Sequence, residues 1–261
     1  MLNLTKKENP KPLHWSEEEW RLRVDLAAAY RLVDYFGWTE LIYGHLTAHI
    51  PGEKPHFLIN PYGLNYDEVT ASNLIKIDID GNLVEESEYN VNEAGFVIHS
   101  AIHMCSTEEN RVVMHTHTRA GMAVAALEEG LLQVSMNATA FFGDIAYHDY
   151  EGPSLYLDER ERLVESLDGK RAMILRNHGL MTVGKTVAAA FQRLYRLERA
   201  CQVQIDAGAA GKLNIMSDNL AAKSGVDTNA FAESEDGFGF GELEYAALLR
   251  KIDRIDGSYA A

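Results

Sequence analysis

The 261-residue chain has few cysteines and few basic residues. Its two cysteines, Cys105 and Cys201, lie far apart in the sequence, so we expect two reduced core thiols rather than a stabilising disulfide. Lys and Arg number 24 against 39 Asp and Glu, which gives a net charge of −15. A nucleic-acid backbone or an anionic membrane is bound mainly by clustered Lys and Arg, and no basic run here is longer than Lys6-Lys7. The charge balance therefore argues against both kinds of partner.

Long apolar segments are missing as well. No stretch reaches the ~18 apolar residues needed to cross a bilayer, and the first ten residues lack the apolar region of a secretory signal. We therefore expect a cytoplasmic protein. With 46% hydrophobic and 24% charged residues, the chain has the composition of a folded globular protein.

The pattern of apolar residues predicts three regions: a polar arm (1–15), a main domain (16–212) and an acidic tail (213–261). The tail carries seven acidic residues and one basic residue between positions 218 and 244, and a last amphipathic helix is expected at 242–252. Within the main domain, helical spacing and period-2 alternation interleave, which predicts an α/β fold with helices on both faces of one sheet. The expected helices are 17–36, 92–104, 120–127, 160–167 and 186–210, and the expected strands are 41–50, 56–60, 75–79, 111–117 and 172–175.

The sequence His115-Thr116-His117 is the strongest chemical signal. Residues i and i+2 of a strand point to the same face, so two imidazoles should project together from the end of a buried strand. The plainer alternative is two partly exposed histidines at a strand end. His178 follows the strand at 172–175, and Gly179 after it would allow a sharp turn. Three neutral imidazoles would leave a coordination position open on Zn, Mn, Fe, Co or Ni.

The remaining histidines have weaker signals. His99 and His103 are four residues apart on one helix face, which suits a second metal pair but is more typical of ordinary helix packing. His45 and His49 are ambiguous, and we expect His148 to lie in a loop.

Several motifs, in this order along the chain, resemble those of the class II aldolase/adducin family, and most closely its adducin-head-like branch. The resemblance covers about residues 16–212. It rests on Asn60-Pro61-Tyr62-Gly63, Arg111-Val112-Val113-Met114-His115-Thr116-His117, Gly143-Asp144-Ile145-Ala146, Asn177-His178-Gly179 and Glu198-Arg199-Ala200-Cys201. The family implies a three-layer α/β/α fold with a central, largely antiparallel sheet. It also implies a divalent metal held by His115, His117 and His178, with active sites at the subunit interfaces of a tetramer.

The sequence departs from the sugar-phosphate aldolases of that family at the substrate site. The family's catalytic Glu falls at Gly95, and its two phosphate-binding serines fall at Glu93 and Ala94. A Gly-Asn turn that contacts phosphate becomes Gly44 followed by His45. A Tyr that acts as general acid from the neighbouring subunit falls at Asn137. The resemblance therefore implies a substrate that is not the usual sugar phosphate.

Candidate roles follow from these positions. Glu93 is the candidate general base or extra metal ligand, although the helix dipole alone would favour a carboxylate there. The candidate substrate-binding residues are His45, Asn60, Gly63 and Asn137.

Three functions fit the resemblance. The first is a metal-dependent carbon–carbon lyase, an aldolase or decarboxylase, that acts on a small hydroxy or oxo compound with zinc as the first choice of metal. The second is a non-haem iron oxygenase on the same scaffold. The third is a non-catalytic binding module such as the adducin head. A complete three-histidine set favours an enzyme, and we expect a homo-oligomer.

Overall fold

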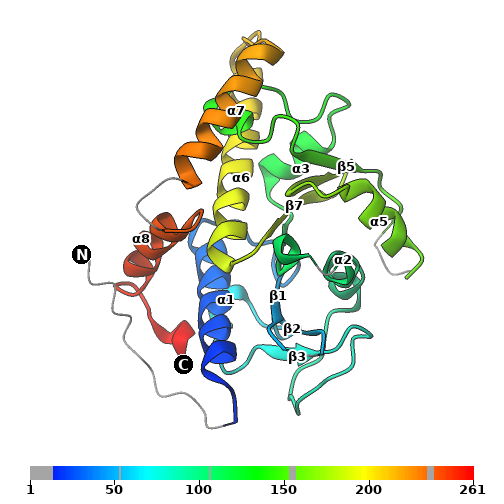
Figure 1. The fold of residues 1–261 in the computed structure, drawn as a ribbon, viewed down its shortest axis with the longest axis vertical. Coiled ribbons are helices and arrows are strands. Elements are labelled where there is room, and N and C mark those ends of the chain that lie inside the picture. The colour runs from blue at the N-terminus through cyan, green and yellow to red at the C-terminus, as the bar shows by residue number, and fades with distance from the viewer. Residues whose placement is uncertain (1–13, 53, 106, 153–156, 234–237) are drawn as a thin grey trace.

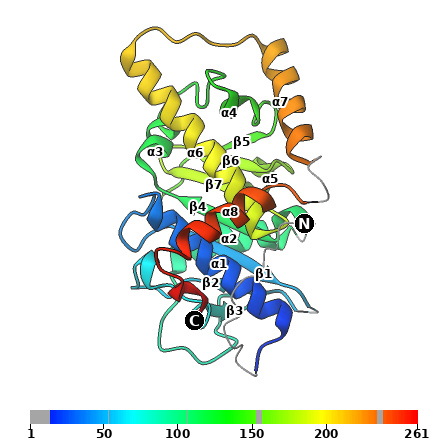
Figure 2. The same ribbon diagram turned by 90° about the vertical axis from the view of Figure 1, so that its left-hand side faces the viewer.

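The fold is known from a computed structural model, which describes residues 14–52, 54–105, 107–152, 157–233 and 238–261, without the side chains of 93, 94 and 231–233. One sheet with helices on both faces forms the centre of the molecule (Figures 1 and 2). The predicted arm at 1–15 lies almost entirely outside the described residues. The strands are β1 (His45–Ile50), β2 (His56–Ile59), β3 (Ile75–Ile77), β4 (Val112–Thr116), β5 (Ile145–His148), β6 (Ala172–Leu175) and β7 (Gly179–Gly184). The helices are α1 (Glu17–Tyr35), α2 (Glu93–Met104), α3 (Arg119–Ala125), α4 (Met136–Thr139), α5 (Glu159–Leu167), α6 (Val187–Ala210), α7 (Asp218–Glu233) and α8 (Glu242–Ile252), with short 3₁₀ turns at Tyr66–Glu68, Glu108–Asn110 and Ser258–Ala260.

The sheet has seven strands in the order β3-β2-β1-β4-β7-β6-β5. Only the β5–β6 pair is parallel among these neighbours. This confirms the expected α/β class with a largely antiparallel sheet. The histidine-bearing strand β4 lies at the centre, between β1 and β7.

The two faces of the sheet are covered by different helices, and the period-2 alternation of β4 shows why. Val112 and Met114 belong to the large core that includes residues of α1, α3, α6 and α8. Val113, between them, points to the opposite face and packs with residues of α2 and α5. Because both faces are buried, the strand is apolar on both sides until it reaches His115.

Helix α1 begins where the sequence predicts. Ser16 is the N-cap, and its Oγ accepts a hydrogen bond from the backbone N–H of Glu19 at 3.0 Å. The carboxylate of Glu19 itself binds Arg23 and Lys76.

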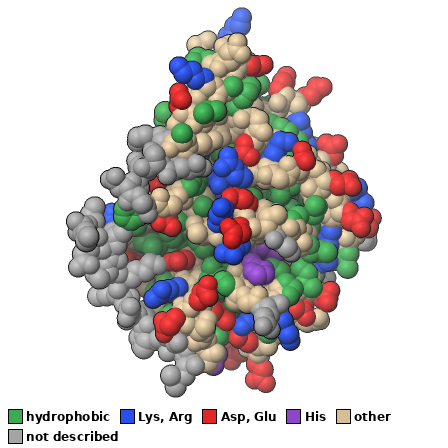
Figure 3. All heavy atoms as spheres, in the orientation of Figure 1, with side chains coloured by type: hydrophobic (Ala, Val, Ile, Leu, Met, Phe, Trp, Pro, Cys, Tyr) green, Lys and Arg blue, Asp and Glu red, His purple; other side chains and the backbone are tan. Residues whose placement is uncertain are grey.

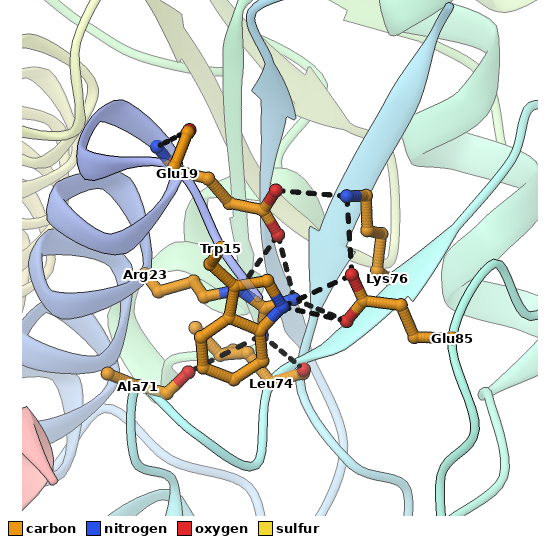
Figure 4. Close-up of polar contacts among 8 residues, drawn as sticks. Trp15, Glu19, Arg23, Ala71, Leu74, Lys76 and Glu85 are labelled. Carbon is orange, nitrogen blue, oxygen red and sulfur yellow. Dashed lines mark hydrogen bonds and ion pairs between the residues drawn. The ribbon is translucent and has the colours of Figure 1, made fainter. Parts of the chain in front are cut away.

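Arg23 is fully buried at the centre of a polar cluster that joins α1 to β3 (Figure 4). Its guanidinium contacts Glu19 at 3.0 Å and Glu85 at 3.2 Å and stacks 3.8 Å from the ring centre of Trp15. Lys76 Nζ contacts the same two carboxylates, at 2.9 and 3.3 Å. A buried charge is tolerated when it is paired and hydrogen-bonded, so this cluster is structural.

The C-terminal region contributes to the core. Helix α8 forms as predicted and packs on α1 and α6 through Tyr245, Leu249 and Ile252. Helix α7 was not predicted. It packs against α4, where Ser224 and Thr139 hydroxyls are hydrogen-bonded at 2.9 Å. In the described parts of the chain, no helix combines the length and apolar character that a membrane crossing requires.

Candidate metal centre

His115, His117 and His178 come together at one end of the central strands. His115 lies near the end of β4, His117 directly follows that strand, and His178 lies in the turn between β6 and β7. The Nε2 atoms of His115 and His117 are 2.7 Å apart, and those of His117 and His178 are 2.9 Å apart. Among the described residues, these three are the group of His, Cys, Asp and Glu side chains that could hold a metal ion. The sequence prediction of which histidines cluster is therefore confirmed, while their role as ligands stays a proposal.

Two of the three rings have a partner at Nδ1, on the edge opposite the Nε2 atom that faces the centre. His115 Nδ1 lies 2.9 Å from the carbonyl oxygen of Leu180, which can only accept, so this nitrogen carries the proton. His117 Nδ1 lies 2.9 Å from a carboxylate oxygen of Glu40. In both rings the Nε2 lone pair is left free to face the centre, as in metal sites whose ligands are oriented by a second group. The sequence analysis did not nominate Glu40, because no motif or spacing around residue 40 links it to His117.

Burial keeps the three imidazoles neutral. It lowers the pKa of His115 well below the usual value, and the neighbouring His178 and His117 lower it further. Burial and His117 lower the pKa of His178 to about 4. Burial also lowers the pKa of His117, although the Glu40 carboxylate opposes the shift. Neutral imidazoles at neutral pH are what metal coordination requires.

The turn that presents His178 differs from the expected one. The left-handed residue is Asn177, with φ of 55°, and Gly179 is already the first residue of β7. A Cβ on Gly179 would lie 2.5 Å from the carbonyl oxygen of Thr116. The prediction that Gly179 makes the turn is therefore wrong: glycine is needed there for the close approach of β7 to β4.

His45 lies beside this centre. It pairs directly with His115 in the β1–β4 register, so both side chains leave the same face of the sheet. A Cβ on Gly95 would lie only 2.2 to 2.5 Å from atoms of the His45 ring. The imidazole thus fills the space that any side chain at position 95 would need. Burial, with His117 and His178, lowers the pKa of His45 to about 3, and a hydrogen bond with Asn60 offsets part of the shift.

The other predicted site residues have no described contact with the three clustered histidines. Asn60 is buried, and its Oδ1 lies 2.9 Å from the Tyr30 hydroxyl. Gly63 is exposed, with φ of 106°. Asn137 lies on α4, which packs against α6 and α7 rather than on the strands that carry the histidines. Glu93 is the first residue of α2, but its side chain lies outside the described part of the chain, so its role stays a prediction.

His99 and His103 share a hydroxyl. Thr47 Oγ1 lies 2.7 Å from His99 Nδ1 and 2.7 Å from His103 Nε2, and all three side chains are buried. This arrangement favours the helix-packing interpretation over a second metal pair. His148 is not a loop residue as expected: it is the last residue of β5, is buried, and is hydrogen-bonded to Ser166 at 2.9 Å.

Two adjoining hollows open beside His178. The larger, of about 620 Å³, is lined by Tyr150 and Arg176 together with Glu128 and Asp149. The smaller one reaches His178 itself. The ring of Tyr150 lies 6.2 Å from that of His178. Histidine side chains reach the molecular surface with charged groups close by (Figure 3).

The sequence profile described as "Class II Aldolase and Adducin N-terminal domain" matches residues 24–205. The chain belongs to this family. A Caulobacter vibrioides protein whose name places it in aldolase class 2 is 44% identical over 248 residues, covering 94% of each chain. Mouse alpha-adducin is 41% identical over 254 residues, which cover 92% of this chain but 34% of adducin.

Solved structures agree with this family assignment. An aldolase II superfamily protein of Pseudomonas syringae has a TM-score of 0.86 at 47% identity and covers 95% of this chain, with 98% of its own chain covered. L-fuculose 1-phosphate aldolase of Glaciozyma antarctica has a TM-score of 0.79 at 31% identity, with 96% of each chain covered. The chain therefore has the three-layer fold that the family resemblance implied.

Proposed function

We propose that this class II aldolase family member is a divalent-metal-dependent carbon–carbon lyase, an aldolase or decarboxylase, acting on a small, non-phosphorylated hydroxy or oxo compound. The observation that carries the proposal is the convergence of the Nε2 atoms of His115, His117 and His178. Three neutral imidazoles with converging Nε2 atoms, two of them oriented through Nδ1, form the arrangement that a bound metal ion requires.

The residues present fit a metal ion. The three Nε2 atoms form a nitrogen donor set suited to Zn, Mn, Fe, Co or Ni, with zinc our first expectation. A divalent ion bound there supplies a Lewis acid that polarises a carbonyl or hydroxyl oxygen and stabilises developing negative charge. Leu180 and Glu40 hold the protons of His115 and His117 on Nδ1, which keeps both Nε2 atoms available. Glu93 is the proposed general base.

The charges near the centre support a substrate without phosphate. Among the described residues that line the two hollows beside His178, Arg176 is the one Lys or Arg. The same lining carries the carboxylates of Glu128, Asp149, Glu151 and Glu159, of which Glu151 is ion-paired with Arg162. Arg176 Nη1 already donates to the carbonyl oxygen of Leu127 at 2.6 Å. A phosphate dianion would meet net repulsion from these carboxylates. The Glaciozyma antarctica aldolase is named for a sugar phosphate, but this chain has Glu93 and Ala94 where the family's phosphate-binding serines fall.

We also propose a homo-oligomer, a tetramer by family resemblance, in which Asn137 reaches the metal centre of a neighbouring copy. Its own helix α4 packs on α6 and α7. Met136 beside it is 71% exposed, and Leu41 near the metal centre is 74% exposed. Light scattering during size-exclusion chromatography tests this, and a monomer at micromolar concentration would contradict it.

Metal analysis tests the central proposal. The protein purified without chelator should carry about one divalent ion per chain, and His115→Ala should lose it while keeping its circular dichroism spectrum. His56→Ala, a change on β2, is the matched control and should keep the metal. Metal content near zero, with no thermal stabilisation by added Zn, Mn or Fe, would refute the proposal.

The reaction type needs a second measurement. Metal-loaded protein should cleave a carbon–carbon bond in some member of a panel of small hydroxy and oxo acids, detected as aldehyde or carbon dioxide release. Oxygen uptake by the Fe(II)-loaded protein with the same panel would favour the oxygenase alternative. Metal bound without turnover of any panel member would favour the binding-module alternative.

A further inference from the structure

Helix α3 contacts the segments that carry the clustered histidines at both of its ends. Its N-cap residue Thr118 directly follows His117. The carbonyl oxygen of its last residue, Ala125, accepts a hydrogen bond at 3.0 Å from the backbone N–H of Asn177, which directly precedes His178. The position of this one short helix therefore bears on two of the three histidines.

The third histidine is reached through β7. A Cβ on Gly121, in the first turn of α3, would lie 2.7 Å from Cγ of Leu180, so the helix backbone lies directly against this side chain. The carbonyl oxygen of the same Leu180 accepts the hydrogen bond from His115 Nδ1. Helix α3 is thus the element that packs against the surroundings of all three rings.

The start of α3 is fixed by a buried carboxylate of α6, the helix beside it (Figure 2). The Thr118 hydroxyl accepts a hydrogen bond from the N–H of Gly121 at 3.1 Å and donates its single hydrogen to Oε2 of Glu198. Oε1 of Glu198 accepts from Gln202 Nε2 at 2.8 Å. Thr118 is 6% exposed and Glu198 is 2% exposed, so water does not compete for these contacts.

The carboxylate of Glu198 is costly to bury. Burial raises its pKa, and the hydrogen bonds from Thr118 and Gln202 and the charge of Arg199 offset only part of that shift. A buried carboxylate is tolerated when its oxygens are hydrogen-bonded, as both are here. What the contact supplies is a defined position for the Thr118 hydroxyl, and with it for the turn that joins His117 to α3.

We propose that Glu198 is a positioning residue of the metal centre: through Thr118 it fixes the start of α3, and α3 sets the spacing of the three histidines. The inference rests on the proposed function, since it concerns how well these histidines hold a metal ion. The described contacts of the Glu198 carboxylate are with Thr118 and Gln202, so it acts through the segment that it anchors. Metal–ligand distances vary by only about 0.2 Å, so a small shift of α3 is enough to weaken binding.

Zinc affinity, measured by competition with a chromophoric chelator, tests the proposal. Glu198→Ala and Thr118→Val should each raise the dissociation constant about 3- to 10-fold, less than the 10- to 100-fold loss typical of a group that touches a ligand directly. The double variant should be no weaker than the more affected single variant, because the two groups act as one unit. Glu198→Gln and Thr118→Ser keep an acceptor oxygen and the hydroxyl, so both should restore zinc binding.

Gln204→Ala is the matched control. Gln204 is also 2% exposed and lies on α6, but its amide binds the backbone of Gly130 and Leu132, away from the histidine-bearing segments. Its loss should lower the urea midpoint, as the loss of Glu198 does, and leave the zinc dissociation constant unchanged. The comparison separates positioning of the ligands from a general weakening of the packing of α6.

Cobalt provides a second measurement, of coordination geometry. The visible absorption of bound Co²⁺ depends on the arrangement of its ligands, so Glu198→Ala and Thr118→Val should change the bands and Gln204→Ala should not. If Glu198→Ala does not fold, Thr118→Val, which removes one hydroxyl at nearly constant volume, decides the matter by itself.

Two outcomes would overturn the proposal. One is unchanged zinc affinity and an unchanged cobalt spectrum in Thr118→Val, and the other is an equal loss of zinc affinity in Gln204→Ala. A protein that binds neither Zn²⁺ nor Co²⁺ would instead refute the proposed function. Positioning would then be measured in the metal-free protein with ¹⁵N-labelled histidine: the ring signals of His117 should move in Thr118→Val and stay in place in Gln204→Ala, and unmoved signals in both would refute it.

Discussion

The Glu40 carboxylate lies 2.9 Å from His117 Nδ1, on the edge of the ring opposite the Nε2 atom that faces His115 and His178. Glu40 sits just before β1, where the chain bends through Leu41 at φ of 52°. An acidic residue before β1 thus orients a ring that directly follows β4. A carboxylate in this position fixes the tautomer of a metal-binding histidine and raises its basicity.

Removing this carboxylate should weaken metal binding. Glu40→Ala should raise the dissociation constant for Zn²⁺ about 10- to 100-fold, the usual effect of losing such a second group. Competition with a chromophoric chelator measures it. Glu18→Ala, which removes an exposed carboxylate from α1, is the control and should have no effect. Unchanged zinc affinity in Glu40→Ala would show that Glu40 does not support a ligand.

Gly95→Ala should destabilise the fold although alanine is the better helix former. Its Cβ would lie 2.2 Å from the His45 ring, so the free energy of unfolding should fall by about 1–3 kcal/mol. Gly208→Ala, in α6 with open space around it, should instead stabilise by about 0.5–1 kcal/mol. Urea unfolding measures both. The effect at position 95 should shrink in a His45→Ala background, and additive effects would contradict the predicted contact.

The buried histidines predict acid sensitivity of the metal-free protein. Burial lowers the pKa of His45 and of His103 to about 3 in the folded state, whereas an unfolded histidine titrates near 6.5. Between these values the unfolded chain binds protons that the folded chain does not. Each such histidine therefore costs up to about 1.4 kcal/mol of stability per pH unit as the pH falls from 6.5 toward 3.

Urea midpoints measured from pH 7.5 to pH 5 should fall accordingly. His103→Gln removes one titrating group, so its midpoint, lower at pH 7.5, should depend less steeply on pH. A midpoint that stays constant down to pH 5 would mean that these rings are not held neutral in the folded state.

The docking of α7 should depend on Gly225. A Cβ at this position would lie 2.5 Å from the backbone oxygen of Thr139, which cannot move without disturbing α4. Gly225→Ala should therefore loosen α7, seen as faster hydrogen exchange over residues 218–230. Ser224→Ala, which loses one hydrogen bond to Thr139, should have a smaller effect. Equal exchange in Gly225→Ala and the unaltered protein would contradict this packing.

Helix α7 itself shows where sequence patterns fail. Its residues carry little helical amphipathicity, because only Ala221 and Gly225 among the described positions are buried, and both are small. Helix α8 was predictable because Tyr245, Leu249 and Ile252 recur at helical spacing and face the core. A helix that packs through small residues leaves no periodic apolar signal.

The sequence by itself determined the strand that carries His115 and leads into His117, the third histidine of the cluster, and the family. Periodicity of two and a short apolar run are local properties, so they can be recognised without knowing the fold. Only the tertiary structure decided that Glu40 contacts Nδ1 of His117, that His45 fills the space beside Gly95, and that Thr47 links His99 to His103. Each of these is a contact between segments far apart in the chain, and such contacts depend on how β1, α2 and β4 pack together.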